Sequence, residues 1–439
     1  MHFCYRPAKV KQIQQLIREL NVLSAFFRFL SGAVSIAVPV LSATCSVNAQ
    51  TQQQISWCEG GNEVTPDQRL SGCTAVIESG RYEGDKLSNA FSNRGLAYSA
   101  KGESDRAIQD YDQSIRLNPQ NAATFNNRGN VYLNRHQSDL AIQDYDQAVR
   151  LDLKYADAFN NRGLAYAQKR QFARTIQDSE QAIRLNPQSA RAFNTHGSAY
   201  IGLGEFDRAI ADFDRAIRLN PQYADAYNNR ALALKNKGQF DRAIQDYDNA
   251  IRLNPQLADA YNNRGLAYRA MGDNDRAIQD YDQVVRLNPQ FAEGFDNRGN
   301  AYNSKGQFDR AIEDYDQALR LDPQFSDAYN NRGYAYRNKG EFNRAIKDFD
   351  QAIRLVPTSI RYILNRSMAL YLAGKYDEAI AGYDTAGRVD PRASAANLYG
   401  RGLAELKKGD SAKGNADIGA AKALQPGIVE QFAKSGIQP

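Results

Sequence analysis

Apolar residues recur along much of this chain with the spacing of α-helices. Residues 224–257 contain two such helical faces in succession. Gly238 lies between them, where a helix end favours a residue that tolerates positive φ, and Pro255 ends the second segment. Such a helix pair has to stack on neighbouring pairs to bury its apolar face. The two faces consist of Tyr227, Ala231 and Leu234, and of Ala243, Tyr247 and Ala250.

The pattern returns every 34 residues. The segment Asn-Asn-Arg-Gly-Leu-Ala-Tyr occurs at 160–166 and again at 262–268, three periods later. A fixed period in this range indicates a solenoid of repeated helix pairs. Nine units fill residues 88–393, and they begin at residues 88, 122, 156, 190, 224, 258, 292, 326 and 360.

The repeated unit resembles the tetratricopeptide repeat (TPR). The resemblance implies an all-α fold, a right-handed superhelical solenoid of antiparallel helix pairs whose first helices line a concave groove that holds peptides. It covers roughly 70% of the chain, and so many copies in phase make it specific. In the unit 292–325, the family pattern of large and small residues is matched by Phe295, Gly299, Tyr302, Gly306, Ala311, Tyr315, Ala318 and Pro323.

The units depart from the family pattern at position 7, counted from the first residue of each unit. Arg stands where the family usually has Leu, and His196 replaces it in one unit. We expect each guanidinium to pair with an aspartate of a second helix, such as Asp280 or Asp282; direct contact with a ligand is the alternative. The unit at 156 is the weakest interior one, with Arg170 in place of Gly. The position-7 residues are Arg94, Arg128, Arg162, Arg230, Arg264, Arg298, Arg332 and Arg366.

Residues 1–49 precede the periodic region and have the pattern of a signal peptide. A basic leader is followed by an apolar run at 29–43 and by small residues at 47–49. The pattern predicts export from a bacterial cell. An uncleaved membrane anchor is the alternative, although the run is short for a span. Cys45 suggests a lipoprotein, but Thr44 before it fits a lipobox poorly. The length of the leader also leaves the true translation start open.

Residues 50–87 are predicted to form an N-terminal cap. After export, Cys58 and Cys73 would be the remaining cysteines, an even number in an oxidising compartment, which predicts a disulfide. Two buried free thiols in a cytoplasmic cap are the alternative. Residues 65–68, Thr-Pro-Asp-Gln, have the pattern of a capped helix start. At the other end, residues 394–439 are predicted to form a degenerate repeat and a C-terminal capping helix.

Position 6 of the unit is asparagine almost throughout, with Thr195 as the gap. Carboxamides have two donors and an acceptor. If the first helices line a groove, as the resemblance implies, this column could bind the backbone of an extended peptide. The alternative is that these asparagines hydrogen-bond within or between helices. The candidate peptide-binding residues are Asn93, Asn127, Asn161, Asn229, Asn263, Asn297, Asn331 and Asn365.

Several other classes of function are disfavoured. The formal charge of +5 falls to about +1 without residues 1–49, too little for a nucleic-acid binder. A carboxylate clamp, another mode known in the family, needs basic residues at positions 2 and 5, but position 2 is mostly acidic and position 5 is never basic. We find no nucleophile elbow, P-loop or local metal-ligand spacing, and therefore expect no enzyme activity, no metal and no cofactor.

The sequence thus predicts a non-catalytic protein-protein interaction scaffold of the cell envelope. It is expected to be exported to the periplasm and to bind an extended segment of a protein or peptide partner in its groove. A chaperone-like holder of exported unfolded polypeptides is the alternative function, and a membrane anchor formed by the uncleaved N-terminal segment is the alternative location.

Overall fold

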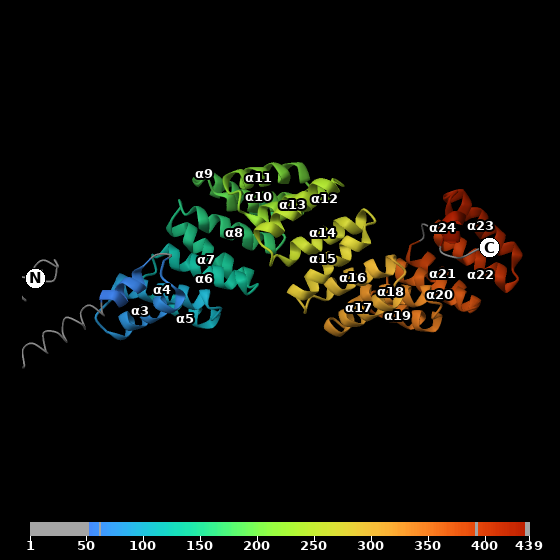
Figure 1. Ribbon diagram of the computed structural model, residues 1–439, viewed down its shortest axis with the longest axis horizontal. Helices are drawn as coiled ribbons and strands as arrows, with labels where there is room; N and C mark the ends of the chain where they lie inside the picture. Colours follow the sequence, from blue (N-terminus) through green and yellow to red (C-terminus); the bar gives the residue numbers. More distant parts are fainter. Residues whose placement is uncertain (1–51, 61–62, 391–393, 435–439) are drawn as a thin grey trace, which may run out of the picture. The chain divides into compact units, whose positions relative to one another are not determined.

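The computed structural model describes residues 52–60, 63–390 and 394–434, and these residues form α-helices joined by short connections (Figure 1). The predicted signal peptide at 1–49 lies outside them. Within the described ranges, no helix is both long enough and apolar enough to span a membrane. The chain divides into two compact units, the first ending at Asn186 and the second beginning at Pro187.

In the first unit, residues 52–59 are helical and are followed by successive helix hairpins. Each helix packs on the next one along the chain. The helix α4 begins at Gly84, before the repeat start predicted at 88. The helices are α3 (Pro66–Glu78), α4 (Gly84–Ala100), α5 (Ser104–Leu117), α6 (Ala122–Asn134), α7 (Ser138–Leu151), α8 (Ala156–Gln168) and α9 (Phe172–Leu185).

The second unit continues with hairpins of the same kind, and the first helix of each pair also touches the first helix of the next pair. Its helices are α10 (Ala190–Leu203), α11 (Phe206–Leu219), α12 (Ala224–Asn236), α13 (Phe240–Leu253), α14 (Ala258–Ala270), α15 (Asn274–Leu287), α16 (Ala292–Ser304), α17 (Phe308–Leu321), α18 (Ser326–Asn338), α19 (Phe342–Leu355), α20 (Ile360–Leu372), α21 (Tyr376–Val389), α22 (Ala395–Lys408), α23 (Ser411–Leu424) and α24 (Ile428–Lys434).

Alternation of large and small residues lets the two helices of a hairpin approach closely. Tyr281 of α15 is fully buried, and its ring lies against Gly265 of α14, where a Cβ atom would come within 2.8 Å of the ring. The turn between the helices contains Gly272 at φ 82°, in the left-handed region that glycine adopts at little cost. The predicted helical faces are therefore the packed faces.

The departures noted in the unit at 156 have structural consequences. Arg170 occupies the turn position that is glycine in most units, and it has a φ of 57°, which is unfavourable for a residue with a side chain. Thr175 and Ser179 replace the alanine and the aromatic residue of α9, and both are buried. Each hydroxyl group donates to a backbone carbonyl group, so polar contacts replace part of the apolar packing there.

The N-terminal cap contains the predicted disulfide between Cys58 and Cys73, whose Cα atoms are 4.5 Å apart. The helix α3 starts with the predicted capping box: the Thr65 hydroxyl accepts from the Gln68 backbone amide, and the Gln68 side chain accepts from the Thr65 amide. This helix packs on α4, so the disulfide joins the preceding segment to the helix that covers the first hairpin.

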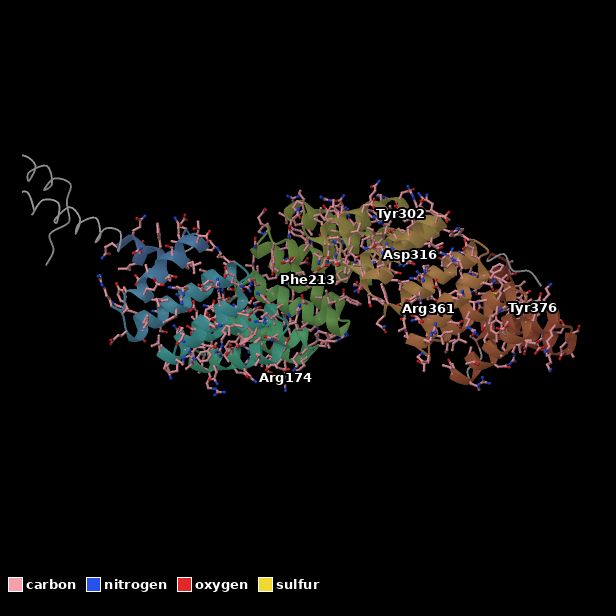
Figure 2. All side chains as sticks on the ribbon, turned by 90° about the horizontal axis from the view of Figure 1, so that it is seen from below. Arg174, Phe213, Tyr302, Asp316, Arg361 and Tyr376 are labelled. Carbon is pink, nitrogen blue, oxygen red and sulfur yellow. A yellow bond between two sulfur atoms is a disulfide. The ribbon has the colours of Figure 1, made fainter. Side chains whose placement is uncertain are left out.

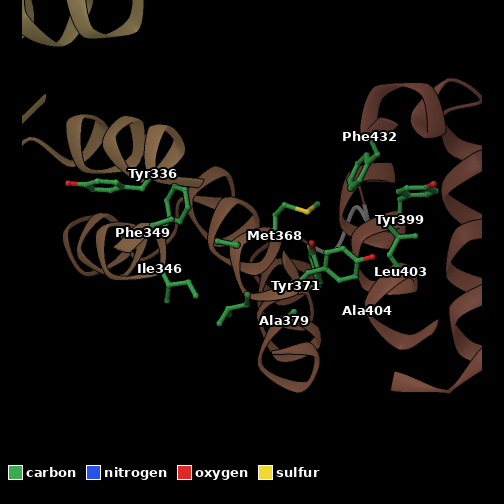
Figure 3. Close-up of a cluster of buried hydrophobic side chains, with 14 of the residues drawn as sticks. Tyr336, Ile346, Phe349, Met368, Tyr371, Ala379, Tyr399, Leu403, Ala404 and Phe432 are labelled. Carbon is green, nitrogen blue, oxygen red and sulfur yellow. The ribbon is translucent and has the colours of Figure 1, made fainter. Parts of the chain in front are cut away.

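The C-terminal part of the second unit has the largest apolar core of the described chain, and Figure 3 shows part of it. Tyr399 of α22 meets the ring of Phe432 edge to face, with ring centroids 4.7 Å apart. Phe432 belongs to the short helix α24, which packs on α22 and α23. The terminal helix therefore covers the apolar side of the last helix pair.

Candidate functional site

The arginines at position 7 form buried ion pairs. Arg298 donates two hydrogen bonds to Asp314 in the second helix of its own unit, at 2.9 and 2.7 Å, and a third to Asp282 of the preceding unit, at 2.7 Å. Burial alone would lower the pKa of Arg298, but the hydrogen bonds and charges of the two aspartates raise it above its usual value. The guanidinium therefore stays charged and links two consecutive units.

The same arrangement recurs in both compact units and confirms the predicted pairing with second-helix aspartates. Asp316, labelled in Figure 2, is one of these aspartates. Because two carboxylates occupy each of these guanidinium groups, we assign the column to the fold rather than to a ligand. The further bridges join Arg128 to Asp144 and Asp112, Arg162 to Asp178 and Asp146, Arg230 to Asp246 and Asp214, Arg264 to Asp280 and Asp248, and Arg332 to Asp348 and Asp316.

The asparagines at position 6 make contacts between consecutive first helices. In the second unit, the Asn365 side-chain amide donates to Asn330 at 2.8 Å, Asn330 donates to Asn331 at 3.3 Å, and Asn331 donates to Asp296 at 2.9 Å. Side-chain carboxamides and one carboxylate thus form a continuous chain across three first helices.

Other members of the column behave in the same way. Asn161 donates to Asn126, Asn229 to Asn194 and Asn297 to Asn262, at 2.9 to 3.0 Å. Asn93 donates instead to the Cys58 carbonyl group in the cap, at 3.0 Å. Asn127 accepts a long hydrogen bond, at 3.5 Å, from Asn126, and Asn263 has no side-chain hydrogen bond within the described chain. The alternative expectation, hydrogen bonding between helices, is therefore observed for five of the eight asparagines. Each of these bonds uses only one of the two amide hydrogens of the donating asparagine. The bonds therefore do not decide whether the column also binds a ligand, and ligand binding stays a prediction.

Asp296 is the one carboxylate in this chain of amides. It is buried, and it also accepts from Asn300 at 2.8 Å. Burial raises the pKa of Asp296 to about 6, although the hydrogen bond from Asn331 and the positive charge of Arg269 act in the opposite direction. Asp296 therefore ionises near neutral pH at the centre of the first-helix face.

A cavity of about 480 Å³ lies at the C-terminal end of the second unit. Apolar side chains from α20 and Phe432 of α24 form much of its wall, and Asn365 of the predicted column also lines it. Arg337 of α18 reaches the cavity beside the Tyr334 ring, whose centroid is 4.1 Å from the guanidinium carbon. Burial lowers the pKa of Arg337. A smaller cavity, of about 240 Å³, adjoins Cys58 and Asn93 in the first unit.

Comparison with known protein families gives matches along most of the repeat region. Sequence profiles described as TPR repeat match residues 89–135, 137–169, 197–238, 233–272 and 299–340, and those described as tetratricopeptide repeat match residues 156–189, 258–291 and 326–359. Together they cover more than half of the chain. The chain belongs to the tetratricopeptide repeat family.

Solved structures of other proteins, two of them described as TPR proteins, are similar to this chain. YrrB, described as a TPR protein with an unusual peptide-binding site, is 23% identical over 42% of this chain and 95% of its own, with a TM-score of 0.37. A tetratricopeptide repeat protein from Parabacteroides merdae is 21% identical over 57% of this chain and 99% of its own, with a TM-score of 0.46. Yeast Tom70 is 16% identical over 84% of this chain and 90% of its own, with a TM-score of 0.42. No curated protein sequence matches significantly.

One feature of this TPR chain was missed in the sequence. Basic residues stand at position 12 of three units of the second compact unit, as Lys235, Arg269 and Arg337. Positions 5 and 12 are seven residues apart, close to two helical turns, and so share a helix face. Burial lowers the pKa of Lys235, as it does for Arg337. The signal that indicates these residues is the repeat itself, because the same periodicity that relates positions 2 and 5 extends to position 12.

Proposed function

We propose that this TPR chain is a non-catalytic scaffold that binds an extended segment of a partner protein on the face of its first helices. TPR repeats are protein-interaction modules, and members of the family bind protein or peptide partners. The observation that carries the proposal is the continuous row of amides and one carboxylate from Asn365 to Asp296. The partly exposed carboxamides of Asn331 and Asn365 keep lone pairs and an amide hydrogen with which they can bind a backbone.

The charges on this face favour a ligand bound in one orientation. Acidic residues at position 2, such as Asp225 and Asp259, lie about 15 Å along the helix from the basic residues at position 12, given a rise of about 1.5 Å per residue. Burial and the charge of Asp259 raise the pKa of Asp225, which is the result expected for neighbouring like charges. A cationic group of the partner would suit the acidic residues at position 2, and an anionic group would suit the basic residues at position 12.

The proposed location is the periplasm or cell envelope of a bacterium. The pattern of residues 1–49 supports export, and the Cys58–Cys73 disulfide is the kind of bond that persists in oxidising compartments. A holder of unfolded exported polypeptides is the second candidate, because side-chain amides that bind a backbone discriminate little between sequences.

Photo-crosslinking can test the binding face. A photoreactive amino acid at Leu266, on the first helix α14, is expected to crosslink a partner in intact cells, whereas the same group at the exposed Gln279, on the second helix α15, is not. Equal crosslinking from both positions would contradict the proposed face. One recurrent partner would favour the scaffold, and many unrelated partners would favour the holder of unfolded chains.

Substitution can then test the asparagine column. Replacing Asn263 and Asn297 with Ala is expected to weaken capture of the crosslinked partner, while helicity stays unchanged. The matched control replaces Gln245 and Gln279, two exposed amides on second helices, with Ala. Capture that is equal for the two double variants would show that the column is structural only.

A further inference from the structure

The cavity at the C-terminal end of the second unit combines an apolar wall with two arginines, Arg337 and Arg361. Ile360, Leu364 and Met368 of α20 line it together with Phe432. Met368 and Phe432 come from different helices and border the same space (Figure 3). Large apolar side chains around about 480 Å³ suit a bulky apolar group of a ligand.

Arg337 has no carboxylate partner among the described residues. Arg361, the other basic residue at the cavity, is paired with Asp327 and lies on the surface of the second unit (Figure 2). The contacts of Arg337 are with the Tyr334 ring. A desolvated cation without a counter-ion is unfavourable, so an anion that enters the cavity would gain from pairing with this guanidinium.

A comparison within the chain shows which anion fits. Arg269 stands at position 12 of its unit, as Arg337 does, and position 5 of the following unit holds Asp296, a buried carboxylate whose ionisation is favoured by the charge of Arg269. The residue at the matching position after Arg337 is Leu364. At this equivalent position the apolar side chain of Leu364 lines the cavity, so the chain supplies a carboxylate near Arg269 but none from this position near Arg337.

We infer that this cavity anchors a partner segment in which an aspartate or glutamate stands next to a large apolar residue. The acidic side chain pairs with Arg337, and the apolar side chain fills the space between Met368 and Phe432. This inference rests on the proposed function and adds the chemistry of the partner. Arg361 and the Asn365 carboxamide, which also line the cavity, lie where they can bind the adjacent backbone.

Fluorescence anisotropy with the full chain tests the inference. The probes are two hexapeptides, Ala-Ala-Leu-Asp-Ala-Ala and its Asn counterpart, each labelled at the amino end and amidated at the carboxyl end so that only the side-chain charge differs. We expect the Asp peptide to bind at least about tenfold more tightly, as a charge-assisted hydrogen bond implies. Equal affinities would overturn the inference. Preferential binding of an Asn peptide with a free carboxyl end would also overturn it, because the site would then recognise a chain terminus.

Four variants locate the preference. Arg337→Gln is expected to abolish it, and Arg269→Gln, outside the cavity, to preserve it. Leu364→Asp supplies an internal carboxylate and should abolish the preference, whereas Leu364→Asn loses the same apolar group without adding charge and should keep it. Circular dichroism and thermal melting identify folded variants for comparison. A preference that survives Arg337→Gln would refute the site. A partner that still crosslinks to the first-helix face while the peptide preference is absent would refute this anchor alone. Failure of any partner to crosslink to that face in the wild type would refute the proposed function.

Discussion

Replacing Asp296 with Asn is expected to stabilise the protein at neutral pH. Burial raises the pKa of this carboxyl from its usual 3.8 to about 6, so the folded state binds a proton more tightly than the unfolded chain does. Protonation therefore favours folding at low pH, and this contribution is lost as the pH rises through about 6. At neutral pH the buried, ionised carboxylate lowers the free energy of unfolding, and an uncharged asparagine would not have this effect.

The size of the effect follows from the same pKa. Since each tenfold change in proton affinity corresponds to about 1.4 kcal/mol, ionised Asp296 lowers the free energy of unfolding by about 3 kcal/mol at about pH 7.5. This loss of unfolding free energy falls to about 1 kcal/mol at about pH 4.5, where the carboxyl group of the unfolded chain begins to bind protons as well. Asp296→Asn is expected to recover about these amounts of free energy at the two pH values.

The chain already contains the arrangement that the variant would create. In the first compact unit, Asn126 occupies the same unit position, and Asn130, four residues later, accepts from the Tyr145 hydroxyl at 2.7 Å. Asn300, the neighbour that donates to Asp296, accepts from the Tyr315 hydroxyl in the same way, at 3.0 Å. The surroundings of position 296 therefore match those of Asn126. An asparagine at 296 therefore has a packing precedent in this protein, and we expect no new cavity or steric clash.

Native-state hydrogen exchange measured by mass spectrometry is the suitable assay, because repeat arrays can open unit by unit. The opening free energy of α16 in the wild type and the variant is compared at about pH 7.5 and about pH 4.5. Asn330→Asp, at the same position of the next unit, is the reverse control and should destabilise most at the higher pH. A variant that is no more stable than the wild type at neutral pH, or a gain that does not change with pH, would refute the reasoning.

Three further predictions concern stability. Arg170→Gly is expected to raise the free energy of unfolding by about 1 kcal/mol, and with it the melting temperature, because glycine adopts the positive φ of this residue without strain. An unchanged or lower melting temperature would contradict this. Asp280→Ala is expected to cost about 3 kcal/mol in urea denaturation, because it removes one of the two carboxylates that neutralise Arg264; a loss much smaller than that of other buried ion pairs would argue against a structural role. Replacing Cys58 and Cys73 together with Ser should cost about 3 kcal/mol, given the sequence separation of 15 residues, and reduction of the wild type should have the same effect; a melting curve insensitive to reduction would contradict it.

The helical fold could be predicted from the sequence because its determinants are local. The spacing of Ala243, Tyr247 and Ala250 places three residues on one helix face, and all three are fully buried. The pairing of Arg298 with Asp314 was predictable for a similar reason, since the partners lie 16 residues apart within one hairpin.

The bonding of the candidate site was harder to predict, because it depends on contacts between units. Asn331 lies 35 residues from Asp296 in the sequence, and the unit pattern alone did not decide whether its amide meets a ligand or a neighbouring helix. The cavity beside Arg337 also depends on Phe432, which lies beyond the periodic region. Periodicity could have indicated the basic residues at position 12, but not the cavity that one of them lines.

The bridging of arginines between consecutive repeat units, as for Arg264 and Arg298, makes this part of the array modular. A second copy of residues 258–291 inserted after 291 would find every partner it needs: its own Asp280 and the Asp282 of the original copy for its arginine, and a new aspartate for Arg298. Removal of a whole interior unit would be equally balanced. A change in length by one whole repeat within this part of the array therefore preserves every bridged ion pair.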